Sequence, residues 1–193
     1  MTKLSVNINK IATLRNARGG NVPNVVQFAK DCERFGADGI TVHPRPDERH
    51  ITLKDVYDLA PVVKTEFNIE GYPDARFMEI IRSVKPAQAT LVPDPPHVIT
   101  SNTGWDVTKN KQLLIDIVQE IQSYGVRVSL FLNPEIHQVH EAKLTGTNRI
   151  EFYTGPFAEH YAENKNIAVA PYVKAAKAAY DIALGINAGH DLS

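Results

Sequence analysis

Side chains that can transfer protons stand directly after three short apolar runs of the sequence. His43 follows Gly-Ile-Thr-Val, Glu70 follows Phe-Asn-Ile, and His190 follows Asn-Ala-Gly. Imidazole and carboxyl groups are common general acids and bases, and a carboxyl group in a poorly hydrated cavity has a raised pKa. We therefore expect acid–base chemistry, with these three side chains as the catalytic residues and Glu70 as the carboxyl group of raised pKa.

Basic side chains follow the first of these candidates within a single loop. Residues 39–50 read Gly-Ile-Thr-Val-His-Pro-Arg-Pro-Asp-Glu-Arg-His, so Arg45 and His50 come shortly after His43. A guanidinium group can bind an oxyanion through two parallel hydrogen bonds, and a neutral imidazole beside it can move a proton. The loop therefore predicts recognition of a phosphorylated substrate.

A second basic stretch follows the first apolar run. Lys10, Arg15 and Arg18 precede two glycines, and we expect a loop that closes over an anion with backbone N–H groups and cationic side chains as donors. Ordinary surface charge is the other interpretation of this stretch. A zinc site built from His43, His50 and Glu70 is a rival interpretation of the pocket, but the neighbouring arginines would repel a cation.

Composition excludes several classes of function. The chain has 193 residues, 21 Lys and Arg against 22 Asp and Glu, and one cysteine. A formal charge of −1 gives no global attraction to nucleic acid or an anionic membrane. The first residues lack the pattern of a signal peptide, and we expect neither a membrane span nor internal disulfides. A cytoplasmic enzyme is the expected class.

The elements that must position these side chains alternate between strand and helix along the whole chain. Helices are expected to begin at Asn24, Thr52, Asp74 and Asn133, each a residue type that caps helix N-termini. Between the helices we expect seven short strands, at residues 4–8, 39–43, 67–70, 88–92, 126–132, 149–152 and 185–187.

This alternation predicts an α/β fold with parallel strands and right-handed crossovers. No Gly-x-Gly-x-x-Gly turn follows the first strand, so a (β/α)8 barrel of the TIM type is favoured over a Rossmann sheet. We expect one domain over residues 1–193, C-terminally incomplete, because the last β/α unit of a barrel of about 250 residues is lacking. The carboxyl ends of all barrel strands share one face, where the candidate residues would surround one pocket.

Four segments of the chain also form a joint pattern. They are Asn-Ile-Asn-Lys-Ile-Ala-Thr-Leu-Arg-Asn-Ala-Arg-Gly (7–19), Gly-Ala-Asp-Gly-Ile-Thr-Val-His-Pro-Arg (36–45), Val-Ser-Leu-Phe (128–131) and Asn-Ala-Gly-His (187–190). With them, the chain from Val6 to its last residue resembles the pyridoxine 5'-phosphate synthase family of vitamin B6 biosynthesis. The resemblance implies condensation of 1-deoxy-D-xylulose 5-phosphate with 3-amino-2-oxopropyl phosphate to pyridoxine 5'-phosphate, phosphate and water. It further implies a cytosolic homo-oligomer, commonly an octamer, that needs no metal or organic cofactor.

The resemblance also implies roles for individual residues. Proton transfer falls on His43, Glu70 and His190, the three residues that the strand ends had already singled out. Contacts with the sugar phosphate fall on Asn9, Lys10, Arg45, His50 and Thr100; contacts with the amino-ketone phosphate fall on Asn7 and Arg18; and Glu151 and Asp191 occupy further pocket positions.

Three positions depart from the family pattern. Asn9 and Lys10 stand where the family often has Asp-His, which exchanges a negative charge and a titratable ring for an amide and a fixed cation. Asp191 stands where a glycine often donates its N–H group to phosphate, so its side chain is expected to point away from that anion.

Two other functions are compatible with the pattern. One is another phosphosugar enzyme, an aldolase or epimerase, although no lysine suited to a Schiff base is evident at a strand end. The other is an inactive or ligand-binding phosphosugar barrel, because the C-terminal unit is missing.

Overall fold

The computed structural model describes residues 1–93 and 103–189. Within these residues, seven strands alternate with helices in an α/β fold of the TIM-barrel type, and no eighth β/α unit is present. The strands follow one another in the sheet in chain order, and those whose pairing is described are parallel. The expected fold class and all seven expected strands are therefore confirmed. The chain divides into two compact units, residues 1–89 and 90–193.

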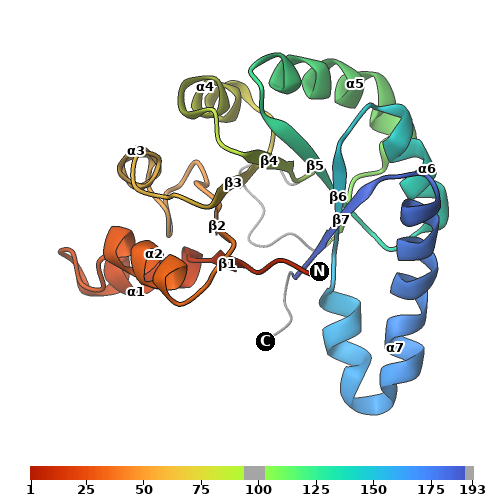
Figure 1. Ribbon diagram of the computed structural model, residues 1–193, viewed down its shortest axis with the longest axis horizontal. Coiled ribbons are helices and arrows are strands. Elements are labelled where there is room, and N and C mark those ends of the chain that lie inside the picture. Colours follow the sequence, from red (N-terminus) through yellow and green to blue (C-terminus); the bar gives the residue numbers. More distant parts are fainter. Residues whose placement is uncertain (94–102, 190–193) are drawn as a thin grey trace. The chain divides into compact units, whose positions relative to one another are not determined.

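In the first unit, helices lie along one side of short parallel strands (Figure 1). Its strand β2 is buried at all four positions, with Ile40 and Val42 inaccessible to solvent. Such continuous burial is typical of a parallel strand with both faces covered. The elements of this unit are β1 (Ser5–Asn7), α1 (Asn9–Arg18), α2 (Val25–Arg34), β2 (Gly39–Val42), α3 (Leu53–Leu59), β3 (Glu66–Gly71) and α4 (Ala75–Val84).

Strand β4 (Gln88–Leu91) runs across the division between the units. In the second unit, helices again lie along one side of the strands (Figure 1). Its further elements are α5 (Val107–Ser123), β5 (Arg127–Leu132), α6 (Ile136–Leu144), β6 (Arg149–Phe152), α7 (Gly155–Asp181) and β7 (Gly185–Ala188).

Side-chain caps explain where several helices begin. Asn24 and Asp74 accept hydrogen bonds from backbone N–H groups three residues later, and Thr52 forms a capping box with Asp55. These three predicted helix starts are confirmed. The start predicted at Asn133 is wrong, because α6 begins at Ile136 and the Asn133 side chain instead accepts a hydrogen bond from the Gly104 N–H group (3.0 Å).

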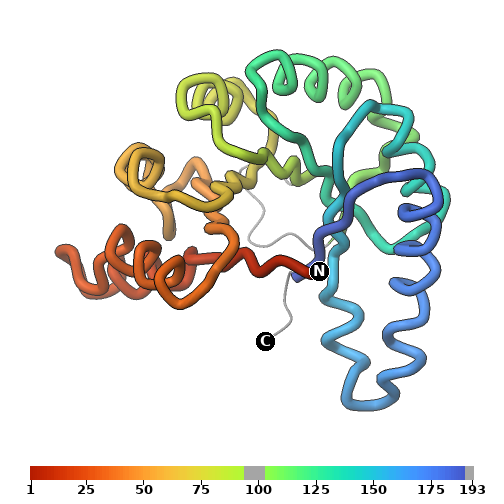
Figure 2. Tube along the Cα trace, in the orientation of Figure 1, coloured from red at the N-terminus to blue at the C-terminus, as the bar shows by residue number. Residues whose placement is uncertain are grey.

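Helix α7 changes direction inside its length. Asn164 has extended backbone angles (φ −157°, ψ 98°), and its side chain accepts hydrogen bonds from the N–H groups of Asn166 and Ile167. It therefore caps a second helical arm, which runs back beside the first (Figure 2). Phe157 of the first arm meets Tyr172 of the second edge to face, with ring centroids 5.9 Å apart.

Candidate functional site

The carboxyl ends of β2 and β3 bring two of the predicted catalytic residues to neighbouring positions. The register pairs Val42 with Ile69, so His43 and Glu70 are the next residues on adjacent parallel strands. Side chains alternate between the two faces of a strand. His43 and Glu70 each come two residues after the paired Thr41 and Asn68, so they lie on the same face as those residues. Both side chains are partly accessible to solvent.

Two asparagines that were predicted to bind substrate connect the end of β1 to the end of β2. The Asn7 side-chain oxygen accepts a hydrogen bond from the Asn9 N–H group (2.9 Å), at the first residue of α1. The Asn9 side-chain oxygen in turn accepts from the His43 N–H group (2.9 Å). These bonds fix the backbone at His43, so the structure brings Asn7, Asn9 and His43 together.

The loop between β2 and α3 carries a cationic and a neutral side chain side by side. Arg45 is buried, and the His43 and His50 ring centroids lie 6.1 Å apart. Burial, followed by the positive charges of Arg45 and Arg49, lowers the pKa of His50 to about 4. His50 Nδ1 accepts a hydrogen bond from the Ile51 N–H group (2.9 Å), so the ring proton lies on Nε2. At neutral pH this imidazole can therefore donate one hydrogen bond from Nε2.

The expectation of a basic loop after the first strand is wrong. Residues 9–18 form helix α1, with Lys10 and Arg18 exposed on its surface. Arg15, expected to face an anion, is 8% exposed and forms a bidentate ion pair with Asp55, which is 6% exposed. The basic residues of this stretch are compatible with an anion-binding loop and equally with a helix that buries one cation and exposes two. The sequence alone did not distinguish these two structures.

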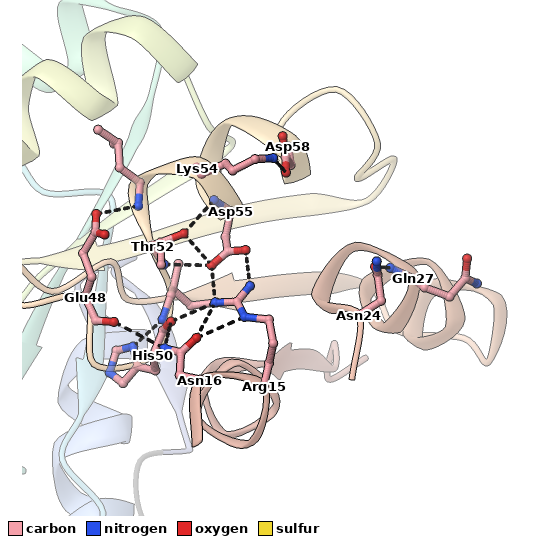
Figure 3. A network of polar contacts seen from close by, with 12 residues as sticks. Arg15, Asn16, Asn24, Gln27, Glu48, His50, Thr52, Lys54, Asp55 and Asp58 are labelled. Atoms are coloured by element: carbon pink, nitrogen blue, oxygen red, sulfur yellow. Dashed lines mark hydrogen bonds and ion pairs between the residues drawn. The ribbon is translucent and has the colours of Figure 1, made fainter. Parts of the chain in front are cut away.

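A set of polar side chains surrounds the β2–α3 loop (Figure 3), and of these the sequence analysis had named only Arg15, in a different role. Arg15, Asn16 and Asp55 hold the second half of the loop from α1 and α3. From α4, Arg76 donates to the Pro44 carbonyl (2.7 Å) and pairs with Glu48 (3.2 Å). The sequence predicted a helix start at Thr52 and a basic stretch that includes Arg15, but neither signal indicates that Asp55 of α3 has its partner on α1.

In the second unit, Glu151 lies on β6 between Ile150 and Phe152, two buried residues whose side chains are on the opposite face of the strand from that of Glu151. Its neighbours in register are Phe131 of β5 and Asn187 of β7. Burial raises the pKa of Glu151 to about 7 even though part of the side chain remains accessible. This carboxyl group can therefore both hold and release a proton near neutral pH.

Three predicted site residues, Thr100, His190 and Asp191, lie outside the described residues. Within residues 1–93 and 103–189, no three His, Cys, Asp or Glu side chains are placed to hold one metal ion. No helix in that part of the chain is both long and apolar enough to cross a bilayer.

Two solved structures have a similar fold but share little sequence with this chain. A mandelate oxidase aligns over 94% of the chain and 66% of its own length, with a TM-score of 0.62 and 9% identity. The dihydropteroate synthase of Stenotrophomonas maltophilia aligns over 99% of the chain and 88% of its own length, with a TM-score of 0.53 and 11% identity. At such identities these likenesses support the fold alone.

Several relatives with similar sequences carry the same name. The pyridoxine 5'-phosphate synthase of Bacteroides fragilis is 59% identical over all 193 residues, which correspond to 81% of that protein. Those of Porphyromonas gingivalis and Flavobacterium johnsoniae are 58% and 55% identical over the same shares. The family model described as "Pyridoxal phosphate biosynthesis protein PdxJ" matches residues 4–193. The chain therefore belongs to the PdxJ family.

Proposed function

We propose that the protein is a pyridoxine 5'-phosphate synthase. It condenses 1-deoxy-D-xylulose 5-phosphate with 3-amino-2-oxopropyl phosphate and releases pyridoxine 5'-phosphate, phosphate and water. The observation that carries this proposal is the 59% identity along the whole chain with the Bacteroides fragilis relative of that name. Ring closure by this route needs several proton transfers, which the acid and base groups of the candidate site can supply.

We assign proton transfer to His43, Glu70 and His190. The geometry in the first unit supports this for His43 and Glu70, because adjacent positions on parallel strands let an imidazole and a carboxyl group act on one substrate. Glu151 of the second unit is assigned to substrate binding, and its pKa of about 7 would let it exchange a proton near neutral pH. The roles of His190 and Asp191 rest on the family resemblance.

Anion binding is divided between the two substrates. The sugar phosphate is assigned to Arg45 and His50, with Asn9, Lys10 and Thr100, and the amino-ketone phosphate to Asn7 and Arg18. A buried guanidinium beside a neutral imidazole that donates from Nε2 supports the first assignment, since both groups donate to phosphate oxygens.

The two departures at the start of α1 are compatible with this function. The Asn9 side chain uses its oxygen to accept from His43 N–H, a role that the oxygen of either an asparagine or an aspartate can fill. Lys10 is exposed and keeps a permanent positive charge near the proposed sugar phosphate. We therefore expect substrate binding to persist with Asn9 and Lys10.

We further propose that the chain acts as a single barrel domain, works in the cytoplasm without a metal or organic cofactor, and assembles into a homo-oligomer. The substrates are small phosphorylated molecules, as the synthase family implies. Neither nucleic acid nor membrane is an expected partner, because the net charge of −1 offers no general attraction to polyanions.

The activity is tested by incubating the purified full-length protein with both phosphorylated substrates and following product by mass spectrometry. Product and inorganic phosphate should appear together, and omission of either substrate should abolish both signals. Binding of the sugar phosphate without any product would contradict the proposal and favour a ligand-binding barrel.

The site assignment is tested by His43→Asn and Glu70→Gln. Each should lower kcat by at least about 100-fold, since a positioned general acid or base contributes on that order. His140→Asn is the matched control, because His140 is an exposed residue of α6. Near-normal turnover in both site variants would reject the assignment.

A further inference from the structure

The β2–α3 loop has a fixed conformation although it contains neither helix nor strand. It carries His43, Arg45 and His50, three residues of the proposed site. Glu48 adopts a left-handed conformation (φ 51°), which is costly for a residue with a side chain. Its carboxylate accepts from the Leu53 N–H group (2.9 Å) and pairs with Arg76 (3.2 Å). The loop is thus held by contacts from outside it.

Asn16 of α1 contacts the carbonyl groups of three consecutive loop residues, and Figure 3 shows it beside two of them, Glu48 and His50. Its Nδ2 donates to the carbonyl oxygens of Glu48 (3.3 Å), Arg49 (3.2 Å) and His50 (2.9 Å). A set of carbonyl oxygens that converges on one amide nitrogen fixes the path of the backbone immediately before the His50 side chain.

Arg15 fixes which way the Asn16 amide faces. Arg15 Nε and Nη2 donate to Asn16 Oδ1 (3.1 and 2.8 Å), and Nη2 also donates to the His50 carbonyl (3.3 Å). If the amide were reversed, its N–H groups would face the guanidinium and its oxygen would face the loop carbonyls. Arg15 therefore makes Asn16 a donor toward the loop.

Asp55 holds Arg15 and begins helix α3 at the same time. Its Oδ2 accepts from the Thr52 N–H group (2.8 Å), the Thr52 hydroxyl (2.8 Å) and Arg15 Nη2 (2.8 Å), while Oδ1 accepts from Arg15 Nη1. Burial alone would raise the pKa of Asp55, but the hydrogen bonds from Arg15 and Thr52 outweigh it and lower the pKa. The carboxylate therefore stays charged and paired.

Stability is a weak explanation for such an arrangement. Replacing a buried ion pair by apolar side chains is often neutral or stabilising, whereas a paired guanidinium fixes direction and register. We propose that Arg15, Asn16 and Asp55 are positioning residues that hold the β2–α3 loop in the conformation in which Arg45 and His50 bind the phosphate of the sugar substrate. The inference rests on the proposed function and deepens it.

The test compares wild type with Asn16→Ala, which removes the loop contacts of Asn16 and leaves the Arg15–Asp55 ion pair. We expect the KM and the calorimetric Kd for 1-deoxy-D-xylulose 5-phosphate to rise about tenfold, because the binding conformation of the loop becomes a minor state. The KM for 3-amino-2-oxopropyl phosphate and kcat should change less than about twofold. Asp58→Asn is the matched control, since Asp58 pairs with Lys54 on the exposed surface of α3.

Hydrogen–deuterium exchange gives a readout independent of turnover. Amide exchange in residues 45–51 should accelerate in Asn16→Ala and stay as in wild type in Asp58→Asn, while the thermal midpoints of all three proteins remain within a few degrees. A general loss of stability would instead raise exchange throughout the first unit. Unchanged sugar-phosphate affinity in Asn16→Ala would overturn the inference.

Failure of the proposed function is distinguishable from failure of the inference. Wild-type protein that binds the sugar phosphate but forms no product would overturn the proposed activity, and the Kd comparison would still decide the role of Asn16. Wild-type protein that binds no sugar phosphate would overturn both.

Discussion

At the scale of single residues, the pKa of His50 in the folded protein differs strongly from its value in water. Its pKa of about 4 lies below the ordinary value of 6.5 because of burial and two neighbouring cations, so the folded protein favours the neutral ring. The stability contributed by this neutral state is complete above about pH 6.5 and declines as the pH falls from there toward 4. The sequence predicted the position of His50 but could not predict its pKa, since burial depends on packing by distant segments.

The His50 prediction is checked by NMR titration of the histidine imidazoles. His50 should be neutral at pH 6 with its proton on Nε2, and its midpoint should lie near 4. Arg49→Gln should raise that midpoint, because it removes one positive charge and leaves Asp47, which favours the charged ring, without its partner. A midpoint near 6.5 in wild type would contradict the prediction.

Glu151 has the opposite pH dependence. Its native pKa of about 7 exceeds the ordinary 4.5, so the contribution to stability is complete below about pH 4.5 and is lost as the pH rises toward 7. Glu151→Gln should therefore raise the thermal midpoint at pH 8 by a few degrees, on the order of 1 kcal/mol, and change it little at pH 4. The sequence assigned a raised carboxyl pKa to Glu70; that assignment remains a prediction, whereas the raised value on Glu151 follows from burial on β6.

At the scale of elements, local chemistry predicted most helix starts and failed where a side chain had a distant partner. Asn24, Thr52 and Asp74 cap helices as expected, because a cap requires only neighbouring backbone groups. Asn133 does not, because its side chain binds Gly104, which is 29 residues away. Helix α1 was predicted to be a loop because Arg15 was expected to face an anion. Its actual partner is Asp55, 40 residues later in the chain, and local sequence does not indicate that contact.

The Arg15–Asp55 pair leads to a prediction about stability. Asp55→Asn leaves a buried guanidinium without its counter-charge, so the free energy of unfolding should fall by about 3 to 5 kcal/mol in urea titrations at pH 7. Asp58→Asn, which removes an exposed pair on the same helix, should change it by less than about 1 kcal/mol. In wild type, the contribution of Asp55 should be lost as the pH falls below its ordinary value of 3.8, because its native pKa is lower still. Equal effects of the two substitutions would contradict this account.

At the scale of the whole molecule, the alternation of strands and helices was enough to predict the fold class and seven strands. The same pattern placed His43 and Glu70 at the ends of neighbouring strands, which the register of β2 and β3 bears out. The contacts that hold the β2–α3 loop were not predictable, because they join residues from three helices that no periodic pattern connects. Sequence periodicity therefore predicts where site residues stand, whereas their orientation depends on tertiary contacts.

The surface of α7 leads to a prediction about assembly. Ile167, Val173 and Tyr180 are 70%, 59% and 81% exposed, an unusual accumulation of large apolar side chains on one helix. Apolar side chains of this kind are commonly covered by another subunit, which supports the proposed homo-oligomer, and the family resemblance leads us to expect an octamer. Sedimentation velocity of the full-length protein should therefore show one main species with eight times the protomer mass. A single species of protomer mass at micromolar concentration would contradict the proposed homo-oligomer while leaving the activity open to its own assay.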